Sequence, residues 1–146
     1  MAELVASVIA IASLAYQSGK TLQDLITGLQ QAPRTLTDLR GDLDAVRCIL
    51  KSFAQSLEKE RSASLSTGLR SCFEHLNPSM RSLADACDEF RRKLRSISRS
   101  SSREDGTLDW RSRIRIHFQE NEIKIFKYRL ASHKATLNVA LSLTAS

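Results

Sequence analysis

The chain has 146 residues, enough for one domain with a proper hydrophobic core. Five Gly and two Pro supply few turn-forming residues for a β-rich fold. An odd number of cysteines argues against a fully paired disulfide framework. Cys48, Cys72 and Cys87 fall on apolar helical faces, which predicts reduced, buried thiols in a cytosolic chain. The net charge of +6 is distributed unevenly along the sequence.

The first nineteen residues are unusually poor in charge, since Glu3 is the only charged residue before Lys20. If this segment is helical, two neighbouring apolar rows run along it, one made of Leu4, Val8, Ile11 and Ala15, the other of Val5, Ile9, Ala12 and Tyr16. A helix that is apolar over most of its circumference is either the buried centre of a bundle or lies in lipid. It is short for the roughly 20 residues that span a bilayer, but long enough to insert. Glu3 occupies the place where a secretory signal carries positive charge, which argues against export.

The bounds of the first two helices are predicted from the spacing of apolar residues and from capping residues. The first helix is predicted over residues 2–31, because Pro33 disfavours helical geometry in the residue before it. The second is predicted over residues 35–60, with Thr35 as its cap and Asp38 in its first turn. Its apolar stripe alternates threes and fours and consists of Leu36, Leu39, Leu43, Val46, Leu50, Phe53 and Leu57. The charged residues off this stripe are predicted to form a solvated face; they are Arg40, Asp42, Asp44, Arg47 and Lys51.

A third helix is predicted over residues 64–97, with a kink or short break near Pro78, which lacks a backbone donor. Its inward face is predicted to contain Leu65, Leu69, Cys72, Leu76, Met80, Leu83, Cys87, Phe90, Leu94 and Ile97. Residues 98–108 are polar and predict a loop. A fourth helix is predicted over residues 109–143, with an inward face of Ile116, Ile123, Phe126, Leu130, His133, Leu137 and Leu141. The predicted fold is all-α, a single domain over residues 1–146 built as an antiparallel four-helix bundle.

The sequence offers little catalytic chemistry. Gly19-Lys20-Thr21 matches the end of a phosphate-binding loop, but the leading glycine is missing and the tripeptide lies inside a helical pattern. Cys72 and His75 are one helical turn apart, yet no second pair at ligand spacing accompanies them. His133 lies on an apolar stripe and is interpreted as a core histidine. We therefore predict a non-enzymatic domain with no catalytic residues, no cofactor and no metal.

A basic patch surrounds the predicted third loop. Its members are Arg91, Arg92, Lys93, Arg95, Arg99, Arg103, Arg111, Arg113 and Arg115. Such a patch attracts anionic lipid or nucleic acid. Lipid is the favoured partner, because aromatic residues for base stacking are not interleaved with these cations and an apolar helix lies in the same chain. The alternative is an ordinary solvated helix end and loop.

Several segments resemble one known family. They are MAELVASVIAIASLA at residues 1–15, LQDLI at 22–26, QAP at 31–33, LTDLRGDLDAVR at 36–47, FQENEIKIF at 118–126 and KATLNVAL at 134–141. This sequence resembles the fungal N-terminal domain of STAND proteins, which are NOD-like receptors, and in particular the HeLo-like group. The resemblance spans nearly the whole chain.

The resemblance implies a helical bundle that forms the N-terminal domain of a signalling receptor. This bundle would act as the cell-death effector. Oligomerisation would release the hydrophobic N-terminal helix into the plasma membrane from a cytoplasmic resting state. The implied membrane-active residues are Leu4, Val5, Val8, Ile9, Ile11, Ala12 and Tyr16. The implied partners are anionic lipid, further copies of the chain and a C-terminal nucleotide-binding receptor module.

Two functions remain open from the sequence. The first is the membrane-targeting effector, assisted by the arginine patch. The second is a non-lytic module for homotypic or adaptor contacts, in which the first helix is simply the central core helix. Nucleic-acid binding through residues 91–115 is a weaker third possibility, and no nucleic acid is expected as a partner.

Overall fold

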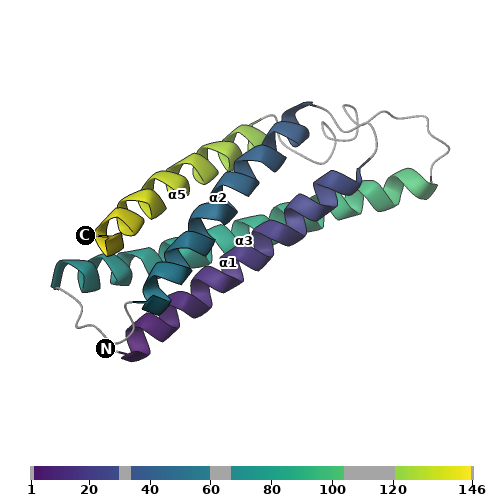
Figure 1. The fold of residues 1–146 in the computed structure, drawn as a ribbon. Coiled ribbons are helices and arrows are strands. Elements are labelled where there is room, and N and C mark those ends of the chain that lie inside the picture. The colour runs from purple at the N-terminus through teal and green to yellow at the C-terminus, as the bar shows by residue number, and fades with distance from the viewer. Residues whose placement is uncertain (1, 30–33, 60–66, 104–120, 146) are drawn as a thin grey trace.

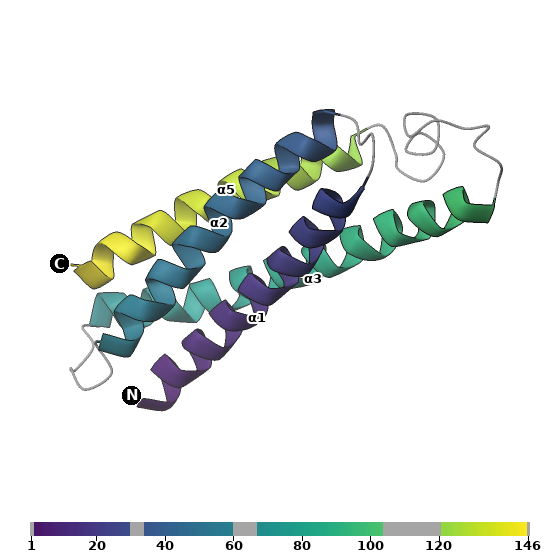
Figure 2. The same cartoon turned by 45° about the vertical axis from the view of Figure 1, so that its right-hand side comes forward.

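The computed structural model describes residues 2–29, 34–59, 67–103 and 121–145. These ranges contain four helices and no strand: α1 (Ala2–Gly28), α2 (Arg34–Lys59), α3 (Thr67–Arg103) and α5 (Glu122–Ala145). Successive helices run in opposite directions, so that the N-terminal end of α1 and the C-terminal end of α5 lie at the same end of the bundle (Figures 1 and 2). The predicted all-α, antiparallel four-helix bundle is confirmed.

Each described helix packs against two others. α1 and α5 both pack closely against α2 and α3, whereas the helices of each diagonal pair stand farther apart. Across one diagonal, Phe53 of α2 and Phe73 of α3 still meet edge to face, with ring centroids 6.0 Å apart. The helices therefore stand at four corners in the order α1, α2, α5, α3 (Figure 2). The sequence left open whether the apolar first helix is buried in a bundle or lies in lipid; in the described structure α1 buries one side in the core and turns another side outward.

The core follows the predicted stripes most closely in α2. All seven predicted apolar residues of that helix are buried, from Leu36 to Leu57. On α1 the buried row is Val5, Val8, Ala12, Ala15, Ser18, Leu22 and Ile26. This row steps by threes and fours and draws on both predicted rows, because the inward side of a corner helix is narrower than a fully apolar circumference.

The third helix continues through Pro78 as one element, as predicted, and differs from its prediction at two other points. α3 continues to Arg103 instead of ending at residue 97. Residues 98–103 include neither Gly nor Pro, so nothing there prevents the helix from continuing. Phe73 is fully buried, while its predicted neighbour Cys72 is only partly buried. Leu65 lies outside the described residues.

The last helix is described from Glu122, after a turn at Asn121 whose carbonyl accepts from Ile125 N at 2.8 Å. The predicted start at Asp109 and the inward position of Ile116 lie outside the described residues. Phe126, Leu130 and Leu137 are buried as predicted, and Ala140 joins them. The predicted inward residues Ile123, His133 and Leu141 are partly buried.

Candidate functional site

The predicted membrane-active residues of α1 divide into two groups. Val5, Val8 and Ala12 are buried in the core. Leu4, Ile9, Ile11 and Tyr16 are partly buried and pack against it. The outward side presents Ser7, Ala10, Ser13 and Leu14, of which Leu14 is 49% exposed. The structure therefore holds the apolar helix by one side and leaves a weakly polar, uncharged side to solvent.

Arg47 of α2 makes the main polar contact with α1. Its Nη2 donates to Tyr16 Oη at 3.0 Å, and its guanidinium carbon lies 4.6 Å from the centre of the Tyr16 ring. Its Nη1 donates to Gln23 Oε1, and Gln23 Nε2 donates in turn to the carbonyl of Arg40 at 3.3 Å. The predicted place of Arg47 on a solvated face is wrong, because α1 covers it. We refer to Arg47, Tyr16 and Gln23 as the α1–α2 polar clamp.

Gly19 lies against the stem of Arg47. A Cβ atom at this position would be 3.4 Å from Arg47 Cγ, an ordinary van der Waals distance, so the arginine stem crosses α1 beside this glycine. The Nε of Arg47 is buried and has no hydrogen-bond partner. The clamp is thus a partly buried cation held by two neutral groups and one aromatic face, not by an acid.

The glycine-lysine-threonine tripeptide has no phosphate-binding geometry. Gly19, Lys20 and Thr21 all lie inside α1, where Thr21 Oγ1 donates to the carbonyl of Gln17 at 2.8 Å. Backbone amides inside a helix are already bonded and are not available to cradle a phosphate.

The basic patch is described only in part. Arg92 and Arg95 are exposed, and Arg91 is partly buried with an Nε atom that has no partner. Lys93 Nζ forms an ion pair with Glu122 Oε2 at 2.7 Å and so joins α3 to the first turn of α5. The side chains of Arg99 and Arg103, and residues Arg111, Arg113 and Arg115 as a whole, lie outside what the structure describes.

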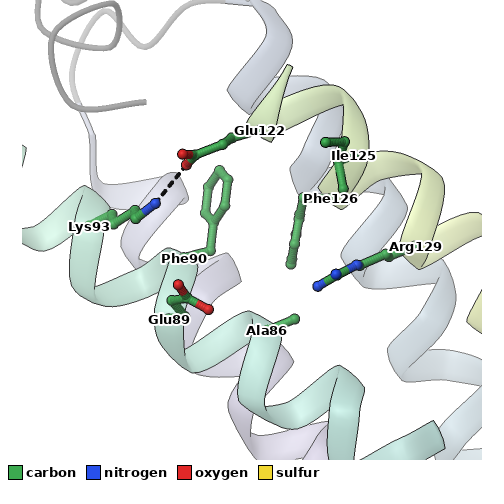
Figure 3. Close-up of a pocket in the computed structure, with 8 residues that line it drawn as sticks. All are labelled: Ala86, Glu89, Phe90, Lys93, Glu122, Ile125, Phe126 and Arg129. Carbon is green, nitrogen blue, oxygen red and sulfur yellow. Dashed lines mark hydrogen bonds and ion pairs between the residues drawn. The ribbon is translucent and has the colours of Figure 1, made fainter. Parts of the chain in front are cut away.

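A groove of about 270 Å³ opens between α3 and α5 beside this ion pair (Figure 3). Phe90 and Phe126 form its floor with their rings stacked, the centroids 4.7 Å apart and the planes inclined by 23°. Its rim carries both signs of charge, from Glu89, Lys93, Glu122 and Arg129 (Figure 3). The lining side chains include no nucleophile, and the aromatic stack acts as packing between two helices.

A second polar contact between these helices involves His133. Its Nδ1 lies 2.9 Å from Ser79 Oγ, one residue after Pro78. Burial and then the neighbouring charge of Arg129 lower the pKa of His133 below its ordinary value of 6.5. The neutral imidazole is therefore favoured in the folded domain, as a satisfied histidine at a helix interface.

The cysteines occupy three different environments. Cys87 is buried, and burial followed by the charge of Asp88 raises its pKa to about 12. Cys72 is partly buried, and burial raises its pKa. Cys48 is exposed, so the prediction of three buried thiols is wrong for this residue, which lies beside the α2 stripe and not on it. Among the described residues, His, Cys, Asp and Glu side chains do not gather in groups of three or more fit for a metal ion.

None of the described helices combines the length and apolar character that crossing a bilayer requires.

These features define the chain as a four-helix bundle domain whose apolar first helix stands at a corner and is clamped to the second. The family model described as "Pigment biosynthesis cluster protein PigL N-terminal" matches residues 2–145, and the chain belongs to this family. No curated protein and no solved structure matches the chain significantly.

Proposed function

We propose that this bundle is a HeLo-like, membrane-targeting and cell-death-inducing effector domain of a fungal innate-immune or incompatibility signalling protein. It is a non-enzymatic cytoplasmic domain at rest. Oligomerisation, driven by a nucleotide-binding receptor module, releases α1 into the plasma membrane. The observation that carries the proposal is that α1 bears no charge from Leu4 to Gly19 and yet stands at a corner of the described bundle, where Ser13 and Leu14 are exposed.

The free energy of this exchange has opposing parts. Withdrawing α1 removes its buried apolar side chains from the core, at about 1.5–3 kcal/mol for each Val, Leu or Ile that becomes exposed to water. Insertion into hydrocarbon recovers this free energy for α1 itself, and it also covers Leu14, which the bundle leaves half exposed. The remaining costs are the exposure of the apolar side chains of α2 and α3 that α1 had covered and the loss of the α1–α2 polar clamp, and clustering of several copies offsets these costs.

The outward serines of α1 provide the test. Ser7 and Ser13 are exposed, so an aspartate at either position is compatible with the bundle. An aspartate near the centre of a bilayer costs about 2.5–3.5 kcal/mol. The Ser7→Asp and Ser13→Asp variants are compared with Ser7→Asn and Ser13→Asn, which are polar and uncharged.

Each protein is tethered by a C-terminal histidine tag to nickel-chelating lipid on dye-filled vesicles, which concentrates it at the surface. We expect the unmodified domain and both asparagine variants to release dye, and both aspartate variants to fail with unchanged helicity by circular dichroism. Equal release by the aspartate variants, or sealed vesicles with the unmodified domain, would refute the proposal.

The second candidate is a non-lytic module for homotypic or adaptor contacts. It is favoured by the contribution of α1 to the core, where Val5, Val8, Ala12 and Ala15 are buried. A groove of about 230 Å³ between α1 and α2, lined in part by Ala12, Ser13 and Ala54, offers a surface for such contacts. Sealed vesicles in the experiment above, together with a folded domain, would favour this function.

A further inference from the structure

α5 carries a second apolar row on the side turned away from the bundle. Four of its large apolar side chains are among the most exposed in the described structure: Ile125 (51%), Tyr128 (77%), Val139 (61%) and Leu143 (45%). Ser132 and Ala135, both exposed, complete a row with steps of three and four residues. This spacing places the row along one line of the helix, opposite the buried side chains of Phe126, Leu130 and Leu137.

The margins of this row are basic. Lys124, Arg129 and Lys134 are exposed on α5. Lys127 lies 3.8 Å from Asp42 of α2, a distance and exposure typical of a weak surface pair. Glu122 is the only acidic residue of α5, and it is joined to Lys93. The charges of α5 beside the row are therefore positive, while the acidic side chains of Glu89 and Glu122 lie in the groove toward α3 together with Lys93.

The exposed apolar row of α5 lies on a ridge between two grooves. On one side, α5 and α3 enclose the groove that includes Ile125 and Arg129. On the other side, α5 and α2 enclose a groove of about 250 Å³ that includes Lys127 and Lys134. Ile125 stands at the edge of the first groove (Figure 3), and Tyr128 and Val139 line neither of them.

We propose that the outer face of α5, made of Ile125, Tyr128, Val139, Leu143 and the lysines and arginine beside them, binds the surface of an anionic membrane in the folded domain. The apolar row enters the boundary between headgroups and acyl chains, and the cations meet lipid phosphates. In the folded domain one apolar side of α5 is buried in the core, and its exposed side combines apolar and basic residues, which suits it to lie in this interface. The inference rests on the proposed function only in sharing the membrane as partner, since it requires no movement of α1.

Other occupants fit this surface less well. A second copy would place the same basic margins against each other, and like charges disfavour that contact. A helix of another protein docks best into a groove, whereas this row forms a ridge between two grooves. A broad anionic surface accepts a ridge and neutralises both of its margins.

The test is co-sedimentation of the full chain with phosphatidylcholine vesicles that contain or lack phosphatidylserine, at low and at high salt. We expect binding only with phosphatidylserine, and weaker binding at high salt. The double variant Tyr128→Ser/Val139→Ser is expected to bind about tenfold more weakly, since it removes two of the apolar side chains from the row. Cys48→Ser is the control, because Cys48 is exposed on α2 and lies outside both α1 and α5, and this variant is expected to bind as the unmodified chain does.

Charge is tested separately with Lys124→Gln/Lys134→Gln, for which we expect a loss of roughly fivefold per cation at low salt. Its control, Lys20→Gln/Lys51→Gln, removes the same net charge from exposed positions of α1 and α2. Equal losses in test and control variants, or equal binding to neutral vesicles, would overturn the inference. So would capture of an acidic helical peptide by α5 with no binding to vesicles.

The two proposals fail in different ways. If only α5 docks, the α5 variants lose sedimentation while the tethered domain leaves vesicles sealed. If only α1 inserts, the tethered domain releases dye while the α5 variants sediment as the unmodified chain does. The circular dichroism of every variant is compared first, because all of the altered residues are exposed and should leave the fold intact.

Discussion

Replacing Arg47 with methionine isolates the contribution of the α1–α2 polar clamp. Methionine keeps an unbranched apolar stem over Gly19 and removes the guanidinium. The change deletes the hydrogen bonds to Tyr16 and Gln23 and the contact of the cation with the Tyr16 ring, at 4.6 Å from its centre. It should therefore weaken the attachment of α1 while leaving the apolar core in place.

The expected loss in free energy of unfolding follows from these contacts. Two hydrogen bonds contribute about 1 kcal/mol each, and the cation–π contact adds about 0.5–1 kcal/mol. Removing the buried Nε, which has no partner, returns about 1 kcal/mol. The net loss in free energy of unfolding is then about 2 kcal/mol, which lowers the Tm of a domain of this size by roughly 4–8 °C.

The assay is urea unfolding followed by circular dichroism, with Arg40→Met as control because Arg40 is exposed on the same helix. The control should change the free energy of unfolding by less than about 0.5 kcal/mol. A cycle with Tyr16→Phe, which removes only the hydroxyl, should give a coupling energy of about 1 kcal/mol. If Arg47→Met is as stable as the unmodified chain, the clamp contributes nothing to the free energy of unfolding, and the prediction is wrong.

Three other predictions follow from single sites. Gly41→Ala should raise the free energy of unfolding by about 0.5–1 kcal/mol in urea, because Gly41 is exposed inside α2 and a Cβ there meets nothing within 4 Å; unchanged or lower stability would contradict this. Burial and Arg129 lower the pKa of His133, so its contribution to stability is complete above pH 6.5 and is lost as the pH falls through that value toward its folded pKa. Tm measured between pH 7 and pH 5 should fall less in His133→Gln than in the unmodified chain, and parallel curves would refute the assignment. Maleimide should label Cys48 rapidly in the native chain and Cys87 only on unfolding, as peptide mass mapping can show, since burial holds the pKa of Cys87 at about 12; native labelling of Cys87 would contradict this.

The periodic part of the fold was predictable. Seven apolar residues at strict spacing define one side of α2, and all seven are buried. Such spacing fixes which side of a helix faces inward, whichever neighbours cover it. The same rule left a one-residue ambiguity in α3, where Cys72 and Phe73 both border the inward side and the larger ring takes the buried position.

The contacts between helices were not predictable. Arg47 lies off the α2 stripe, so the sequence indicates solvent there, and only the packing of α1 brings Tyr16 and Gln23 within reach. The outward row of α5 was missed for a related reason: a helix with apolar residues on two sides gives no single preferred face.

The four-cornered order of the helices determines what survives the loss of one of them. Four interfaces close the bundle into a ring, and α1 takes part in two of these, with α2 and with α3. Without α1, α2 and α3 remain joined by α5 and by the edge-to-face contact between Phe53 and Phe73. The apolar sides of α2 and α3 that α1 had covered would then face outward. To leave the bundle, α1 has to part from two helices, while the helix at the opposite corner keeps its own contacts with both.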